Sequence, residues 1–314
     1  MPATMRAIRQ QAFGGPQVLQ FTEVQRPVPV PTEVLVRVRA VGVNPVEAVI
    51  RSGQFPLLGE PPFILGWDVS GVVEDIEPGV TRFQPGDEVY GMPFFPRPAN
   101  AYAEYVAAPS RQLARKPASL SHAEAAALPL AGLTAWQSLV DTARLEAGQR
   151  VLIHGAGGGV GHLAVQIARA RGAYVIGTAS AGKHDLLRGL GADELIDHRT
   201  DDFTARAADL DVVLDILGGE IARRSIGVLR PGGMLVTVVG RRDTDLATRT
   251  EAAGRRFAGI SVEPDYPGLE ALANLADSGR LRVHLQATLP LAEAAKAHEL
   301  VESGRTAGKI VLTL

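Results

Sequence analysis

A glycine-rich segment, residues 154–161, contains the pattern best suited to chemistry and reads HGAGGGVG. It stands between an apolar run, RVLI, and a stretch of helical character, HLAVQIARARGA. Glycines between a strand and a helix let the backbone turn tightly and approach a phosphate, and the helix N-terminus offers unpaired N–H groups and the positive end of its dipole. The segment therefore predicts a pyrophosphate cradle for a dinucleotide, with Gly161 letting the helix pack close to the sheet.

The kind of dinucleotide depends on the residues that follow the next expected strand. Units that bind NAD usually end that strand with Asp or Glu, about 20 residues after the glycines, and this acid binds the ribose 2′-OH. This chain has Ala179 there, followed by Ser180 and Lys183. A small uncharged residue with hydroxyl and ammonium donors nearby favours a 2′-phosphate, so we expect NADPH, with Arg199 as a further phosphate ligand. The alternative for Lys183 and Arg199 is solvated charge at the end of an element.

The elements that must position this loop alternate between strand and helix from Ser121 onward. Ser121 and Glu124 have the spacing of a capping box at a helix start. The expected strands are apolar on both faces, which is typical of a parallel sheet covered by helices, so we expect a doubly wound α/β Rossmann sheet. Strands are expected at 150–154, 173–179, 193–197, 211–216 and 233–239, with 256–264 as a candidate edge strand. Helices are expected at 160–172, 182–191, 201–208 and 219–229.

The first 120 or so residues have a different character, rich in proline, glycine and β-branched residues. Alternating patterns and Pro-Gly turns predict strands there, and together they suggest a distorted β-barrel. The expected strands are 32–44, 68–80, 85–92, 101–109 and 112–117. The C-terminal residues do not continue the strand–helix alternation and instead predict a helix at 269–282, then a helix and a closing strand within 292–314. We therefore expect one domain from 1–121 plus 266–314, and a nucleotide-binding domain at 122–265.

Composition excludes several classes of protein. The 314-residue chain has a formal net charge of −2 and no cysteine, so a nucleic-acid binder, a disulfide framework, a thiolate nucleophile and a cysteine-ligated zinc are all disfavoured. The seven histidines show no tight ligand spacing, and no G-x-S-x-G motif occurs, so we expect neither a metal nor a hydrolase. The chain contains no apolar run of about 18 residues and no signal-peptide pattern at its start, so we expect a cytoplasmic protein without a membrane partner.

Segments over nearly the whole chain resemble the zinc-free, quinone-reductase-like branch of the medium-chain dehydrogenase/reductase superfamily. They occur in family order and include GVNPVEAVIRSG (42–53), GWDVSGVV (66–73), LPLAGLTAW (128–136), GAGGGVG (155–161) and LRPGGMLVTVVG (229–240). The resemblance implies a GroES-like barrel domain with an inserted Rossmann domain and an NADPH cofactor in the cleft between them. It also implies a homodimer joined through edge strands of the Rossmann sheets.

The resemblance also assigns roles to individual residues. Asn44 and Thr134 match residues that lie near the nicotinamide, and Lys309 matches a common family lysine of unassigned role. Leu217 and Val239 match strand-end positions along the adenosine and the nicotinamide ribose. Ser180 and Lys183 match the 2′-phosphate pocket, and the pyrophosphate loop takes the family form Ala-x-Gly-x-x-Gly at Ala156, Gly157, Gly158, Gly159, Val160 and Gly161.

Departures from the family pattern bear on the chemistry. The zinc-dependent branch holds its metal partly with the His of a GHE motif, and here the matching stretch is GWD, with Trp67 in place of that His. Two tyrosines found in many quinone reductases of this branch are replaced by Val49 and Phe55. Trp67 and Phe55, together with Phe94 and Phe95, are candidates for a flat apolar substrate pocket. The alternative for each aromatic residue is packing in the barrel core or in a surface loop.

These observations favour a zinc-independent, NADPH-dependent oxidoreductase that transfers hydride to a quinone or another α,β-unsaturated carbonyl. An enoyl-thioester reductase of the same superfamily is the first alternative, weakened because it often needs a tyrosine as proton donor. A non-catalytic NADPH-binding or structural protein is the second. A methyltransferase, suggested by LDILGG and LRPGGMLVTV, is the third, although it would not need a barrel-like first domain.

Overall fold

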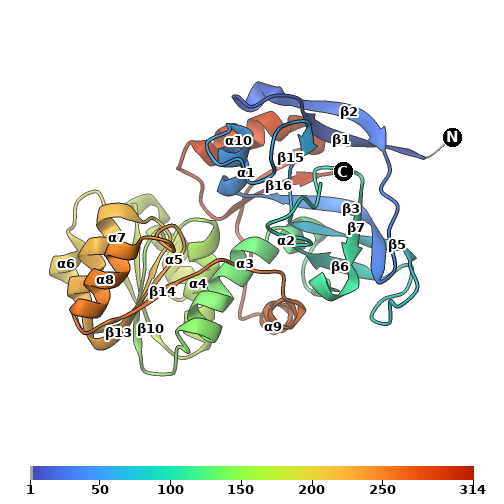
Figure 1. The fold of residues 1–314 in the computed structure, drawn as a ribbon. Helices are drawn as coiled ribbons and strands as arrows, with labels where there is room; N and C mark the ends of the chain where they lie inside the picture. Colours follow the sequence, from blue (N-terminus) through green and yellow to red (C-terminus); the bar gives the residue numbers. More distant parts are fainter. Residues whose placement is uncertain (1–2) are drawn as a thin grey trace. The chain divides into compact units, whose positions relative to one another are not determined.

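The computed structural model describes residues 3–314 and contains two compact units (Figure 1). The first unit consists of residues 3–133, Glu263–Gly279 and Val283–Leu314. The second consists of Thr134–Val262 and Arg280–Arg282. The chain therefore leaves the first unit, builds the second and comes back to complete the first.

The second unit is built on a six-stranded parallel sheet in the order β11-β10-β9-β12-β13-β14. The order reverses at β9, which places the carboxyl ends of β9 and β12 at the switch point where such sheets bind ligands. This confirms the α/β Rossmann fold expected from the sequence. The strands are β9 (Arg150–Ile153), β10 (Tyr174–Ala179), β11 (Glu194–Asp197), β12 (Leu210–Asp215), β13 (Leu229–Thr237) and β14 (Arg256–Gly259).

Apolar side chains from these strands form the core of the second unit with residues from its helices. Leu152, Ile176 and Val213 are fully buried in one cluster with Phe203 of α6 and Leu246 of α8. The helices are α4 (Gly159–Ala170), α5 (His184–Gly189), α6 (Phe203–Arg206), α7 (Gly219–Ser225) and α8 (Thr244–Ala252).

Four of these helices differ from the sequence expectation, and one of them, α6, spans only Phe203–Arg206 of the expected 201–208. Helices α5 and α7 are shorter than expected because a 3₁₀ turn stands before α5 and another follows α7. Helix α8 was not predicted, although Asp243 caps its N-terminus by accepting the N–H of Leu246, and Gly254 follows its end with a φ of +72°.

The first unit contains a seven-stranded sheet in the order β15-β16-β3-β5-β6-β8, with β7 paired to β3, and a three-stranded sheet in the order β2-β1-β4. Strand β16 (red in Figure 1) lies antiparallel beside β3 (blue), which joins the last residues of the chain to residues near its start. These two sheets give the first unit the β-rich architecture expected from the sequence. The strands are β1 (Thr4–Gln10), β2 (Leu19–Gln25), β3 (Glu33–Val43), β4 (Phe63–Ile64), β5 (Val69–Ile76), β6 (Glu88–Gly91), β7 (Tyr105–Pro109), β8 (Leu113–Arg115), β15 (Leu285–Pro290) and β16 (Lys309–Thr313).

Short helices complete the first unit: α1 (Pro45–Arg51), α2 (His122–Ala126), α9 (Tyr266–Asp277) and α10 (Ala294–Glu302). The capping box of α2 forms as expected, since Ser121 Oγ accepts the N–H of Glu124 and the Glu124 carboxylate accepts the N–H of Ser121. Helix α2 lies in the first unit because Ala126 packs with Ala40 of β3 and Val311 of β16. The structural division therefore follows Leu133, inside α3 (Pro129–Trp136), rather than preceding His122.

None of the helices within residues 3–314 combines the length and the apolar character that a membrane crossing requires.

Candidate functional site

The glycine loop joins β9 to α4 in a tight turn. Gly155 has a φ of +61°, and the N–H of Gly158 donates to the Gly155 carbonyl at 2.9 Å. A Cβ on Gly161 would collide with the Gly155 carbonyl oxygen and lie 2.6 Å from the Cα of Ala156. Gly161 is thus needed because the first turn of α4 packs directly on the loop's own backbone. The loop leads directly into the N-terminus of α4, where the backbone N–H groups of a helix start can bind a phosphate.

His154 fixes the start of this loop through a directed chain of hydrogen bonds. Ser225 Oγ donates to the Ile221 carbonyl at 2.7 Å, so it accepts from His154 Nε2 at 2.9 Å. His154 Nδ1 then accepts the Thr178 hydroxyl at 3.2 Å, and Thr178 Oγ1 accepts the N–H of Gly155 at 3.3 Å. Burial lowers the pKa of His154 to about 4. The imidazole is therefore neutral at neutral pH, as this series of hydrogen bonds requires.

The turns after β10 and β11 are held together by one carboxylate. Asp197 Oδ2 accepts the N–H of Ala181 at 3.2 Å and Oδ1 accepts the N–H of Arg199 at 3.0 Å. These bonds hold the pKa of Asp197 below its usual value, with the Arg199 N–H as the largest cause. Ala179 is opposite Asp197 in the sheet register and is only 4% exposed. Asp197 therefore fixes the paths of both turns, with each of its oxygens engaged by a backbone N–H.

Two cationic side chains, Lys183 and Arg199, lie near each other at the turns after β10 and β11. The stem of Lys183 crosses Gly157 so closely that a Cβ there would lie 2.5 Å from Lys183 Cδ. Burial lowers the pKa of Lys183, and the nearby charge of Arg199 lowers it further. Ser180 is the N-cap of the 3₁₀ turn that contains Lys183. Two like charges brought this close are stabilised by an anion between or beside them.

Exposed apolar side chains follow the two strands on the other side of the switch point. Asp215 at the end of β12 accepts the N–H of Leu217 and of Gly218, both at 3.0 Å, and the Thr237 hydroxyl at 2.7 Å. These bonds set the shape of the loop that carries Leu217, which is 48% exposed, and Val239, after β13, is 59% exposed. Both are therefore available to cover an apolar or planar part of a ligand.

Asn44, in the first unit, is held by three partners. Its Oδ1 accepts from Lys309 Nζ at 2.5 Å, and its Nδ2 donates to Asp68 Oδ2 at 3.0 Å. Its backbone N–H donates to Glu47 Oε2 at 2.8 Å. Because Lys309 can only donate, the amide oxygen must face it, and the amide has a single orientation. Lys309, which the sequence left without a role, thus orients Asn44.

Asp68 and Lys309 are opposite charges buried together. Their side chains are 0% and 3% exposed, with Nζ 3.6 Å from Oδ2. Asp68 Oδ1 also accepts the N–H of Leu130 at 2.8 Å. Burial raises the pKa of Asp68, and the Lys309 charge opposes that rise. The pair is stable only while both members are present.

Trp67 is enclosed rather than exposed. It is 1% exposed, its Nε1 donates to the Arg97 carbonyl at 2.8 Å, and its ring contacts the edge of Phe95 at 5.1 Å between centroids. Phe55, in contrast, is 38% exposed. Thr134 is buried at the start of the second unit. Of the proposed pocket aromatics, Phe55 offers a free face, and Trp67 supports the loop that carries Phe95.

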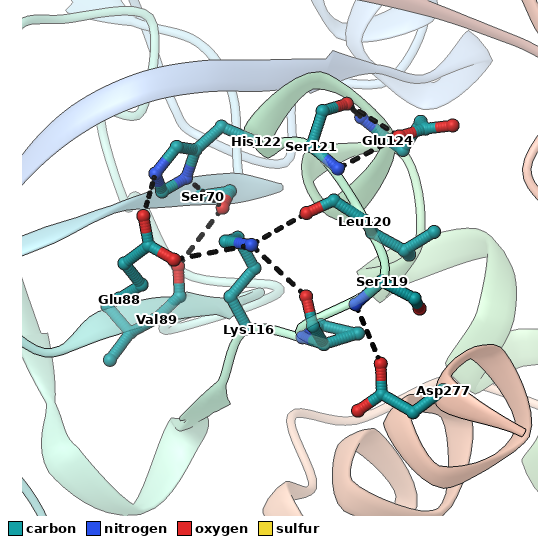
Figure 2. Close-up of polar contacts among 11 residues, drawn as sticks. Ser70, Glu88, Val89, Lys116, Ser119, Leu120, Ser121, His122, Glu124 and Asp277 are labelled. Carbon is teal, nitrogen blue, oxygen red and sulfur yellow. Dashed lines mark hydrogen bonds and ion pairs between the residues drawn. The ribbon is translucent and has the colours of Figure 1, made fainter.

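A separate polar cluster in the first unit has the composition of a hydrolytic triad but not its accessibility. His122 contacts Ser70 Oγ at 2.8 Å through Nδ1 and Glu88 Oε1 at 3.1 Å through Nε2 (Figure 2). Ser70 is fully buried on β5, so no substrate could reach its hydroxyl. Lys116 stands beside Glu88 and donates to the carbonyls of Pro117 and Leu120 (Figure 2). The cluster ties the segment before α2 to the sheet.

Within residues 3–314, no group of three or more His, Cys, Asp or Glu side chains is arranged to hold a metal ion.

Comparison with known proteins gives two family matches. The family model described as alcohol dehydrogenase GroES-like domain matches residues 30–118. The model described as zinc-binding dehydrogenase matches residues 190–312.

Individual proteins match over the full length. A quinone oxidoreductase from Rattus norvegicus is 35% identical over 99% of this chain and 98% of its own length. Among solved structures, the quinone oxidoreductase from Coxiella burnetii has a TM-score of 0.94 at 35% identity, covering 99% of this chain and all of that one (100%). A mycobacterial protein solved in complex with NADPH has a TM-score of 0.86 at 30% identity, covering 99% and 100% of the two chains.

The collision at Gly161 leads to a first prediction. Gly161→Ala should weaken dinucleotide binding at least about tenfold, because the added methyl group must displace the loop backbone. Isothermal titration measures the affinity. Gly189→Ala is the matched control, since a Cβ there meets nothing within 4 Å, and it should bind as the parent does. Equal affinities for the two variants would contradict the packing argument.

The buried charge pair leads to a second prediction. Lys309→Met should lower the free energy of unfolding by about 3–5 kcal/mol, because it leaves Asp68 buried without its partner. Adding Asp68→Asn should restore part of the loss. The exposed Lys296, which pairs with Glu293, provides the control, and Lys296→Met should change stability by less than about 1 kcal/mol. Urea unfolding followed by fluorescence measures all three, and similar values for the two single variants would refute the coupling.

Proposed function

This chain belongs to the quinone-oxidoreductase branch of the medium-chain dehydrogenase/reductase superfamily, and from that premise we propose that it transfers hydride from NADPH to a quinone or another α,β-unsaturated carbonyl without zinc. Family membership makes the protein an oxidoreductase with a nicotinamide cofactor and a small-molecule substrate. The choice of NADPH, the class of acceptor and the acting residues are proposed on the grounds that follow.

The observation that carries the choice of NADPH is the convergence of Lys183 and Arg199 beside Ala179. Arginine and lysine side chains bind phosphate through charge-assisted hydrogen bonds. Ala179 offers no carboxylate to the ribose 2′-OH that NADH carries there. The residues present therefore fit a 2′-phosphate, and Ser180 adds a hydroxyl at the same edge.

The glycine loop fits the remainder of the dinucleotide. The backbone from Ala156 to Gly161 would bind the pyrophosphate at the start of α4, where side chains on Gly157 and Gly161 would collide with the Lys183 stem and with the loop backbone. Leu217 and Val239 would lie along the riboses, covering their exposed apolar surface. When bound, the cofactor supplies hydride from the C4 position of its nicotinamide.

The chain's own contribution near the reacting atoms would come from Asn44 and Thr134. Lys309 and Asp68 fix the Asn44 amide so that one N–H points to Asp68 and the second could donate to a carbonyl oxygen. Such a donor, fixed before substrate arrives, would stabilise negative charge that develops on that oxygen. The Thr134 hydroxyl would help to orient the nicotinamide.

The chemistry of the groups around Asn44 supports a reaction without zinc. Zinc in proteins is bound by thiolate, imidazole and carboxylate ligands. The neighbours of Asp68 here are an amide and an ammonium group, and Lys309 occupies the space beside its carboxylate. The adjacent Trp67 has its only donor committed to the Arg97 carbonyl.

A quinone suits this chain better than an enoyl thioester. Val49 and Phe55, which are 39% and 38% exposed, bear no hydroxyl that could protonate a carbon atom. The oxygens of a reduced quinone can take protons from water, so binding beside the nicotinamide provides most of the acceleration. Phe55 offers an apolar face for such a planar substrate.

We further propose that the protein acts as a cytoplasmic homodimer. Strand β14 is one of the two edge strands of the six-stranded sheet, so its outer edge could pair with the same strand of a second copy. Methyl transfer is not retained, because family membership assigns the chain to the oxidoreductases.

The cation pair generates a third prediction. Lys183→Ala should raise the Kd for NADPH by about tenfold or more and leave the Kd for NADH within about twofold, because only NADPH carries the phosphate. Fluorescence titration with both dinucleotides measures the ratio. Arg188→Ala, which removes an exposed arginine paired with Asp185, is the charge-matched control and should alter neither value. An equal loss of affinity for NADPH and NADH in Lys183→Ala would rule out the phosphate assignment.

The choice of acceptor generates a fourth prediction. The purified protein should oxidise NADPH in the presence of 1,2- or 1,4-quinones, measured by the loss of NADPH absorbance, and act slowly or not at all on enoyl thioesters. Turnover confined to enoyl thioesters would favour the enoyl reductase. Firm NADPH binding without turnover on quinones, enones or enoyl thioesters would favour a non-catalytic role.

A further inference from the structure

A row of buried polar side chains lies behind Asn44, and the proposed hydride transfer makes no use of it. The Tyr102 hydroxyl is 2.7 Å from Glu47 Oε2 and 3.1 Å from His298 Nε2. His298 Nδ1 faces Arg51 Nη1 at 3.5 Å, and Arg51 in turn binds Glu302 of α10 at 2.6 Å. Glu47, Tyr102 and His298 are fully buried, and Arg51 is 2% exposed.

The hydrogen bonds of this row can run in only one direction. Arg51 always donates, so His298 Nδ1 must be the acceptor and Nε2 must bear the proton. The Tyr102 oxygen accepts from Nε2, and its own O–H therefore points to Glu47 Oε2. Burial, and then the Arg51 charge, lower the pKa of His298 to about 3, so this neutral tautomer persists across the ordinary pH range.

Glu47 stands at the end of the row with its two oxygens in different environments. Oε2 accepts two donors, the Tyr102 hydroxyl and the Asn44 backbone N–H. Oε1 is buried and has no hydrogen-bond partner within residues 3–314. A proton bound to Glu47 would therefore occupy Oε1 and leave both hydrogen bonds to Oε2 in place. Protonation of Glu47 removes its negative charge but leaves the hydrogen bond from the Asn44 backbone N–H to Oε2 in place.

The surroundings place this charge change near neutral pH. Burial raises the pKa of Glu47 to about 7, the Tyr102 and Asn44 hydrogen bonds oppose that rise, Asp68 adds to it and Lys309 opposes it. Further along the row, the charged groups are Arg51 of α1 and Glu302 of α10, with His298 between Arg51 and Tyr102. An ionised acceptor holds an N–H about twice as strongly as a neutral one.

We propose that Glu47, Tyr102, His298 and Arg51 are positioning residues for Asn44, and that the ionised form of Glu47 holds Asn44 in its productive place. The inference rests on the proposed function, because it assumes that Asn44 acts on the substrate or the nicotinamide. Tyr102 is the partner that favours this ionised form, and His298 and Arg51 keep the Tyr102 hydroxyl directed at it.

The fifth prediction concerns pH profiles. The kcat/KM for quinone reduction should rise with pH through an inflection near 7 in the parent protein. Glu47→Gln should remove the inflection and lower kcat by up to about tenfold at pH 8, leaving the KM for NADPH unchanged. Tyr102→Phe should move the inflection to higher pH, because Glu47 loses a donor to its charged form. An inflection that persists in Glu47→Gln, or a rate that falls with pH, would overturn the proposal.

A second measurement does not depend on catalysis. The raised pKa of Glu47 means that the folded state binds a proton more tightly than the unfolded state, so its contribution to stability is full below about 4.5 and is lost as pH rises through about 7. The thermal midpoint of Glu47→Gln relative to that of the parent should therefore rise between pH 5 and pH 8. The same difference for Glu60→Gln, at an exposed site, should not change. Should this gain appear without quinone turnover, the proposed function fails and the titration of Glu47 stands. Should turnover appear without the gain, the positioning proposal fails.

Discussion

Two opposite charges, Asp68 and Lys309, are buried side by side, and the packing of the first unit depends on keeping them together. A single buried charge is strongly destabilising, whereas a paired and hydrogen-bonded one is tolerated. Strand β16 can therefore occupy its place beside β3 only when Lys309 reaches Asp68 and the Asn44 oxygen. The pair joins the end of the chain to residues from its first quarter and fixes the amide that the proposed reaction needs.

In the second unit, polar side chains likewise need partners, and here most of the partners are backbone N–H groups. Asp215 and Asp197 accept hydrogen bonds from backbone N–H groups. His154 contacts the Thr178 hydroxyl, which in turn accepts the N–H of Gly155. Their hydrogen bonds determine where the loops after β9, β10 and β12 lie, and the glycines only permit those paths. Loops held in this way at a switch point would give the proposed cofactor a site that is formed before it binds.

Sequence reasoning recovered the strands of the Rossmann sheet because the central ones, β9, β10 and β12, are short apolar runs buried on both faces, as at Val213. It missed β1 and β2, since most β2 side chains lie at the surface and give little apolar periodicity. It also left Lys309 without a role and overlooked Glu47, Tyr102 and His298. These residues meet only in three dimensions, from parts of the chain far apart, and no local spacing reveals them. The one available signal was the presence of ionisable residues within apolar segments, as in the KIVL stretch of β16.

The pairing of Ala179 with Asp197 in the sheet register has a consequence for how cofactor preference could evolve. An acidic residue at 179, the usual means of recognising an unphosphorylated ribose, would enter a nearly closed position beside a carboxylate whose oxygens already fasten two turns. The two negative charges would repel each other. If Asp197 moved away or took up a proton to reduce this repulsion, its hydrogen bonds to the turns that carry Lys183 and Arg199 would weaken. Within the proposed site, a switch to NADH would therefore need coordinated changes on two neighbouring strands, which would make the proposed preference for NADPH resistant to single mutations.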